Sequence, residues 1–125
     1  MLKVCYNFSR CIMERKQVKI YTNFNGIEQN EVFLAIKNDF VIKYIDLDNN
    51  KMVIDVLNNI IKRENSDYLM ELFFENNIIE ITIKKMHIKL KKEIKTLLIK
   101  KNKSEYLVRY QLIDEKEINE YYVNF

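Results

Sequence analysis

The sequence predicts an all-β domain, and two patterns carry this prediction. Short runs in which apolar and polar residues alternate recur along most of the chain, and a period of two is typical of strands with one buried face. Turn signals rich in Asn, Asp and Lys separate these runs by roughly 8 to 12 residues, a spacing typical of antiparallel sandwiches and barrels. The chain has 125 residues, 48% of them apolar and 31% charged, which favours a single folded domain with a core.

Alternation marks out the expected strands in order. In residues 18–24 and 106–112, β-branched, aromatic or leucine side chains occupy every second position, as suits a pleated surface. Polar segments end each run, and Asn25-Gly26 is the strongest turn signal because Gly adopts positive φ at low cost. The expected strands lie at residues 18–24, 31–36, 40–47, 68–74, 79–90, 106–112 and 121–125.

The first twelve residues are harder to place. They alternate as a strand would, yet Met13 stands just before a clean strand. We therefore predict that residues 1–12 form an N-terminal extension or an extra strand, and that residues 13–125 form a single barrel domain. Cys5 and Cys11 do not have the spacing of a metal or redox motif, so we expect reduced thiols.

The central stretch, residues 68–90, is predicted to be a long hairpin whose second strand is bent. Alternation runs through residues 68–74, pauses at an Asn-rich turn, and resumes from Ile79. It slips by one residue at Lys84-Lys85, which we interpret as a β-bulge, since an uncorrected slip would turn later side chains to the wrong face. Strands bend in this way where a sheet curls into a barrel. We therefore expect an antiparallel barrel of about eight strands.

Residues 52–63 fit two structures. Their apolar residues recur at the spacing of one helical face, which makes a short helix the better local pattern. Met52, Ile54 and Val56 also alternate, and the neighbouring strands favour a strand here as well. One short helix therefore stays open as an alternative.

Apolar and aromatic residues define the expected interior. Tyr44, Tyr106 and Tyr110 are candidates to line a ligand-binding lumen, with packing in the core as the alternative. The expected core consists of Ile20, Leu34, Ile42, Val56, Leu72, Ile79, Ile81, Ile88, Val108 and Tyr110.

The chain lacks the motifs of familiar catalytic and metal sites. It has no Pro and one Gly, which excludes glycine-rich phosphate loops and nucleophile elbows. His87 is the only histidine and has no partner at ligand or base spacing. Residues 46–50 resemble the start of a calcium loop, but Lys51 and Leu57 stand where such a loop needs Gly and Glu. We predict no catalytic residue, metal or cofactor, and a protein that is not an enzyme.

Residues 84–103 form the most basic region. Lys85, His87, Lys89 and Lys91 share one face of the expected strand, and such a row could follow a single-stranded nucleic acid. The net charge of +3 is small and glutamates are interspersed, so we do not expect nucleic acid as a partner. Exposed lysines also keep sheet edges from pairing, and we favour that interpretation.

From about Met13 to Phe125 the order of strands and turns resembles the YwiB-like family of uncharacterised bacterial proteins. The resemblance lies in MERKQVKIYTNF, EVFLAIKNDFVIKYID, NNIIEITIKKMHI and RYQL, while Leu57-Asn58-Asn59 replaces an expected glycine. It implies a calycin-like (lipocalin-like) β-barrel with an apolar lumen, and it implies no catalytic residues.

Three functional hypotheses follow. The first is a non-enzymatic barrel that binds a small apolar ligand or acts as a scaffold. The second is a protein-interaction module such as a phage-borne inhibitor or immunity protein, and the third is weak single-strand binding through residues 84–103. The sequence has no long apolar run and no recognisable signal peptide. We therefore expect a cytoplasmic monomer or homodimer that does not contact a membrane.

Overall fold

The computed structural model describes residues 2–4 and 13–125, and every regular element among them is a strand. The strands are β1 (Leu2–Val4), β2 (Met13–Phe24), β3 (Ile27–Asn38), β4 (Val41–Ile45), β5 (Lys51–Asp55), β6 (Ile60–Glu64), β7 (Tyr68–Phe73), β8 (Ile78–Ile83), β9 (Ile88–Lys101), β10 (Glu105–Leu112) and β11 (Asn119–Asn124).

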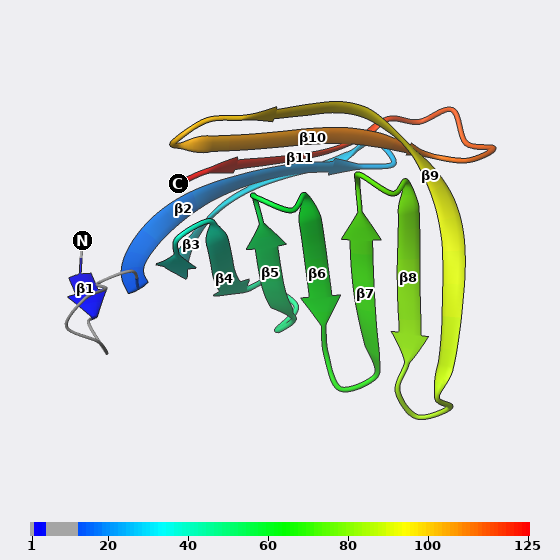
Figure 1. Cartoon of the computed structure of the whole chain (residues 1–125), viewed down its shortest axis with the longest axis horizontal. Helices are drawn as coiled ribbons and strands as arrows, with labels where there is room; N and C mark the ends of the chain where they lie inside the picture. The colour runs from blue at the N-terminus through cyan, green and yellow to red at the C-terminus, as the bar shows by residue number, and fades with distance from the viewer. Residues whose placement is uncertain (1, 5–12) are drawn as a thin grey trace.

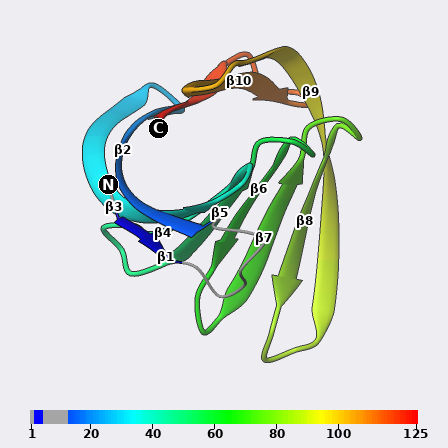
Figure 2. The ribbon, with the colours of Figure 1, turned by 60° about the vertical axis from the view of Figure 1, so that its left-hand side comes forward.

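Strands β2 to β11 form a closed antiparallel barrel of ten strands. Each strand from β3 to β11 pairs with its neighbour in sequence, β11 pairs with β2, and the pairing of β2 with β3 completes the ring. Figure 2 shows β2 and β3 curving round one side of the molecule to complete it. The expected all-β antiparallel barrel is thus confirmed. It has ten strands rather than about eight, because residues 52–63 and residues 79–90 each contribute to two strands instead of one.

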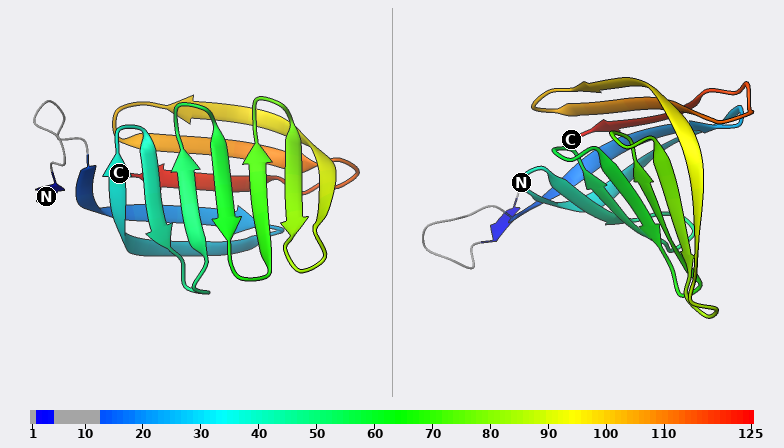
Figure 3. Two further views of the ribbon diagram at one scale, coloured as in Figure 1. Left: turned by 60° about the horizontal axis from the view of Figure 1, so that its bottom comes forward. Right: turned by 45° about the vertical axis from the view of Figure 1, so that its right-hand side comes forward.

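The barrel is flattened into two layers whose strands cross steeply (Figure 1). One layer holds β4 to β8, and the other holds β10, β11 and most of β2. Strand β9 belongs to both, because residues 88–93 pair with β8 and residues 94–101 pair with β10. Figure 3 shows that the layers approach each other along one edge and diverge toward the other. The interior is therefore a wedge, as expected where strands bend to pass between crossed sheets.

The expected bulge at Lys84-Lys85 is wrong. Residues 84–87 form a turn that reverses the chain, with Ile83 paired to Ile88 and His87 at φ +51. Because the turn has four residues, Ile83 and Ile88 point to the same face of the sheet. In the sequence this appears as a one-residue slip in the alternation. Segment 79–90 is accordingly two strands, β8 and the start of β9.

The short helix over residues 52–63 is also absent. Strands β5 and β6 pair as a hairpin around a turn at residues 56–59, where Asn59 has φ +56. The Asp55 carboxylate accepts hydrogen bonds from the Asn58 backbone N–H at 3.0 Å and from its side-chain amide at 2.9 Å. Of the residues at helical spacing, Val56 and Ile61 are buried but Leu57 is 59% exposed, so this spacing does not mark one buried face.

Most of the expected core is buried, with two corrections. Leu34 is 68% exposed, because Phe33 and Ala35 take the inward positions of β3. Ile88 is 39% exposed, because the end of the β8–β9 hairpin extends beyond the opposite layer. The buried apolar residues include Val18, Ile42, Ile54, Phe74, Tyr106, Val108 and Val123.

Of the expected N-terminal extension, the structure describes β1, which pairs with Met13, Glu14 and Arg15 at the start of β2. This pairing lies outside the ring of ten strands. Cys5 and Cys11 lie outside the described residues.

Candidate functional site

The interior of the wedge contains an apolar cavity of about 290 Å³, here named the inner cavity. Its walls come from both layers, mainly from β6, β7, β8 and β10. Its lining consists of Phe24, Asn25, Met52, Ile61, Arg63, Met70, Leu72, Phe74, Ile79, Ile81, Lys92, Tyr110, Leu112, Asn119 and Tyr121. Small-molecule sites are typically concave and mostly apolar, with a few polar groups, and begin at roughly 300 Å³. The inner cavity has this character at the lower end of that range.

Hydrogen bonds of the Asn59 side chain link the two layers at the narrow edge of the wedge. This 5% exposed side chain donates to Glu75 Oε1 at 2.8 Å. Its Oδ1 accepts from Tyr106 Oη at 3.4 Å and from Lys101 Nζ at 3.3 Å. Lys101 also donates to the Val56 carbonyl at 2.9 Å. These bonds join the β5–β6 turn to β9 and β10, so the hollow space lies toward the wide side.

The wide side contains a second hollow of about 330 Å³, here named the outer hollow. Phe24, Met52, Arg63 and Tyr121 line both spaces, so the two are adjacent. The remaining residues around the outer hollow are Ile20, Thr22, Ile27, Gln29, Glu31, Phe33, Tyr44, Asp46, Leu47 and Asp48. Because Ile27 is 67% exposed, this hollow opens to solvent.

A pair of tyrosines lies at the boundary between the two hollows. The hydroxyls of Tyr44 and Tyr121 are hydrogen-bonded to each other, and both residues are buried. Burial raises the pKa of each phenol well above its usual value, because the charged form would lose hydration. Two hydroxyls carry two protons and one proton suffices for their mutual bond, so the second is free to be donated.

The three tyrosines expected to line a lumen occupy different places. Tyr110 lines the inner cavity and Tyr44 lines the outer hollow. Tyr106, which is 0% exposed, packs at the narrow edge beside Asn59 and borders neither space. Tyr106 therefore has the alternative role weighed for it, packing in the core.

Arg63 was not expected at the site, whereas Tyr121 belongs to the aromatic residues expected in the interior and lies on the inner face of β11 with Val123. Arg63 stands two residues after buried Ile61 on β6, so its inward position was hidden by the ambiguity between helix and strand. A charged residue in phase with buried apolar positions is the signal that could have found it.

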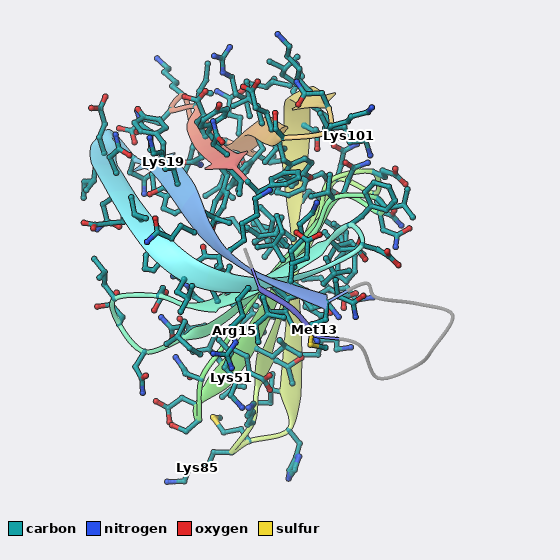
Figure 4. All side chains as sticks on the ribbon, turned by 90° about the vertical axis from the view of Figure 1, so that its left-hand side faces the viewer. Met13, Arg15, Lys19, Lys51, Lys85 and Lys101 are labelled. Carbon is teal, nitrogen blue, oxygen red and sulfur yellow. The ribbon has the colours of Figure 1, made fainter. Side chains whose placement is uncertain are left out.

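The basic residues predicted to share one face are separated in the structure. Lys89 and Lys91 lie on β9, with their Nζ atoms 3.6 and 3.7 Å from the carboxylate of Glu80. Lys85 and His87 lie in the turn at residues 84–87. Figure 4 places Lys85 and Lys101 at opposite ends of the molecule. The region 84–103 is therefore a long, bent strand with partly neutralised lysines rather than one compact basic patch.

Within residues 2–4 and 13–125, no three or more His, Cys, Asp or Glu side chains gather in a way that could hold a metal ion. The described segments also contain no helix with the length and apolar character needed to cross a membrane. The polar groups that line the inner cavity are the guanidinium of Arg63, the amine of Lys92, the amides of Asn25 and Asn119 and the phenols of Tyr110 and Tyr121.

Apolar residues also gather on the outside of the barrel. Ile36 and Ile45 are 40% and 50% exposed, and Val32 and Leu34 are more so. The edge of β3 beside them is bare, since β4 pairs only with residues 36–38 of this twelve-residue strand. Exposed apolar side chains beside an unpaired strand edge are typical of surfaces that associate.

We expect the buried tyrosines to make the fold sensitive to alkali. Burial raises the pKa of Tyr110 to about 12 and raises those of Tyr44, Tyr106 and Tyr121 as well. An unfolded tyrosine has a pKa of about 10. The neutral phenols therefore contribute their full stability below about pH 10, and this contribution is lost as pH rises through the higher folded values.

A titration followed by tyrosinate absorbance and circular dichroism checks this. The exposed phenols should ionise first, and the buried ones should ionise together with the loss of strand signal. Ionisation of all eight tyrosines near pH 10 with an intact strand signal would contradict the burial described above.

Comparison of the chain with protein-family models, with curated proteins and with solved structures found no match.

Proposed function

We propose that this barrel is a non-enzymatic binding protein that holds a small apolar molecule between its two layers. The observation that carries the proposal is the inner cavity of about 290 Å³, whose walls are mostly aliphatic and aromatic. Such a hollow leaves side chains without neighbours on one side, and filling it with an apolar molecule restores those contacts. The adjoining outer hollow provides the route by which a ligand enters.

The resemblance to the YwiB-like family belongs to the same proposal. A calycin-like barrel with an apolar lumen is what that resemblance implies, and the ten-stranded ring with its interior hollow is consistent with it. A cytoplasmic location and the absence of catalysis are further parts of the proposal and rest on the sequence patterns described above.

Stabilisation by 1-octanol tests the proposal. A water molecule occupies about 30 Å³ of the liquid, so the inner cavity corresponds to about ten water-sized groups, close to the size of 1-octanol. A ligand that binds only the folded state raises the free energy of unfolding by about 2.7 kcal/mol at a hundredfold excess over its dissociation constant. We therefore expect 1-octanol to raise the midpoint of thermal unfolding in a saturable manner.

The shorter alcohol ethanol is the control, because it is too small to fill the cavity. Unfolding midpoints that fall equally with both alcohols would contradict ligand binding in the interior.

A protein-interaction module is the second candidate. The exposed Val32, Leu34 and Ile36 and the bare edge of β3 favour it, because an edge strand of a second copy would pair with these backbone groups and cover the apolar side chains. Light scattering distinguishes the two cases, since this association gives the mass of a dimer.

A further inference from the structure

Arg63 is the polar group of the site whose bonding is incomplete. Its Nε is buried and has no hydrogen-bond partner among the described residues. The nearest acid is Asp46, whose Oδ2 lies 3.8 Å from this nitrogen, beyond hydrogen-bond distance. An unsatisfied buried donor is rare in native proteins, and a bound group with a hydrogen-bond acceptor would satisfy it.

Asp46 is held by its own turn rather than by Arg63. Its Oδ1 accepts from the backbone N–H groups of Asp48 at 3.0 Å and Asn50 at 2.8 Å. Its Oδ2 accepts from the Asn50 side-chain amide at 3.0 Å. The carboxylate is thus hydrogen-bonded within the β4–β5 turn, and at 3.8 Å it is an ion-pair neighbour of Arg63 that does not satisfy the Nε–H.

The charges around the two hollows differ in sign. Arg63 and Lys92 are the charged residues that line the inner cavity, and both are cationic. The outer hollow, which Arg63 also lines, is bordered by the acidic side chains Glu31, Asp46 and Asp48. The Arg63 side chain is 31% exposed, and the part of its charge that lies beside apolar walls is stabilised by a paired anion. An anionic group would therefore be favoured at the inner cavity and disfavoured at the outer hollow.

The phenol pair adds a hydrogen-bond donor to the same place. Tyr121 lines both hollows and its hydroxyl is bonded to that of Tyr44. One O–H of this pair is left to be donated. A guanidinium and a neutral phenol together supply charge-assisted and neutral donors to the oxygens of a carboxylate.

We propose that the ligand of this barrel is a monocarboxylic acid with an apolar tail, its carboxylate bound by Arg63 and its tail lying among the aliphatic residues of the inner cavity. This inference rests on the proposed function and adds the chemical class of the ligand. The cavity volume of about 290 Å³ sets the size at about ten non-hydrogen atoms if each occupies about the 30 Å³ of a water molecule. Octanoate, with a chain as long as that of 1-octanol, is the matching probe.

Calorimetric titration with octanoate, 1-octanol and octylamine tests the inference. Charge-assisted hydrogen bonds should make octanoate bind about 10- to 100-fold more tightly than 1-octanol, and octylammonium should bind most weakly. In Arg63→Met, which keeps an unbranched apolar stem and removes the guanidinium, octanoate should lose this advantage while the affinity for 1-octanol is retained. Arg109→Met is the matched control, because Arg109 lies on the exposed side of β10 and pairs with Glu120 at 3.1 Å.

The outcomes separate the two proposals. Equal affinities for octanoate and 1-octanol in the unaltered protein, or an unchanged preference in Arg63→Met, would overturn the carboxylate assignment and leave the apolar site standing. Absence of binding by all three probes would overturn both proposals. The comparison of octanoate with 1-octanol in the unaltered protein tests the carboxylate assignment even if Arg63→Met does not fold.

Discussion

Replacement of Phe74 by alanine is expected to lower the free energy of unfolding by about 3 to 5 kcal/mol, the usual cost of truncating a buried aromatic side chain. Phe74 is 1% exposed, and its ring centroid lies 5.4 Å from that of Tyr110 in the opposite layer. Its backbone carbonyl accepts the Thr96 hydroxyl at 2.7 Å, so the residue lies where the layers meet. Truncation removes this packing and extends the inner cavity toward the narrow edge.

Phe40→Ala is the matched control, because Phe40 is 55% exposed in the β3–β4 turn. It should change the stability by no more than about 0.5 kcal/mol. Chemical denaturation of the three proteins measures both effects. Equal losses for Phe74→Ala and Phe40→Ala would show that the narrow edge is not the packed core described here.

Replacement of Ile81 by tryptophan is expected to lower the affinity for 1-octanol at least about tenfold. Ile81 is partly buried on the inner face of β8, between Met70 on β7 and Leu90 on β9, and it lines the inner cavity. An indole at this position occupies the space proposed for the ligand, and loss of contact with buried apolar area of this size costs more than 1.4 kcal/mol, which is tenfold in affinity.

Thr82→Trp separates this steric effect from the general effect of a bulky residue on the strand. Thr82 follows Ile81 and points to the opposite face, since successive residues of a strand alternate. The thermal shift caused by 1-octanol should persist in Thr82→Trp and vanish in Ile81→Trp. A full shift in both variants would place the ligand outside the inner cavity.

Local patterns in the sequence were enough to predict most of the strands and several of their turns. Alternation located β2, β10 and β11, and Asn25-Gly26 located the hairpin that joins β2 to β3. These features depend on a few adjacent residues, so a single sequence contains them. The hairpins β5–β6 and β8–β9 were misread because residues on the two sides of a tight turn mimic a helical stripe or a shifted strand.

The inward face of β3 and the bend in β9 could not be predicted from local patterns. Val32, Leu34 and Ile36 are apolar on one face, and Phe33 and Ala35 are apolar on the other, so alternation alone does not decide which face is inside. The bend in β9 depends on pairing with β8 and then with β10, and β10 follows only later in the chain. Long-range contacts decide which face of β3 is buried and where β9 bends.

The candidate site depends on these long-range contacts more than the fold does. Arg63 and Tyr121 come from different layers, and only the closed ring brings them to the same cavity. The free Nε of Arg63 results from the hydrogen bonds that hold Asp46 within the β4–β5 turn. Tyr44 and Tyr110 could therefore be predicted from the sequence, whereas their cationic neighbour Arg63 could not.

Methyl chemical-shift mapping during titration with 1-octanol tests most directly whether the ligand lies between the layers. The account predicts shifts at the inward methyl groups of Ile61, Leu72 and Ile79, with the outward groups of Leu34 and Ile45 unchanged. Shifts confined to the outward methyl groups would contradict it, because the ligand would then be bound on the outside of the barrel.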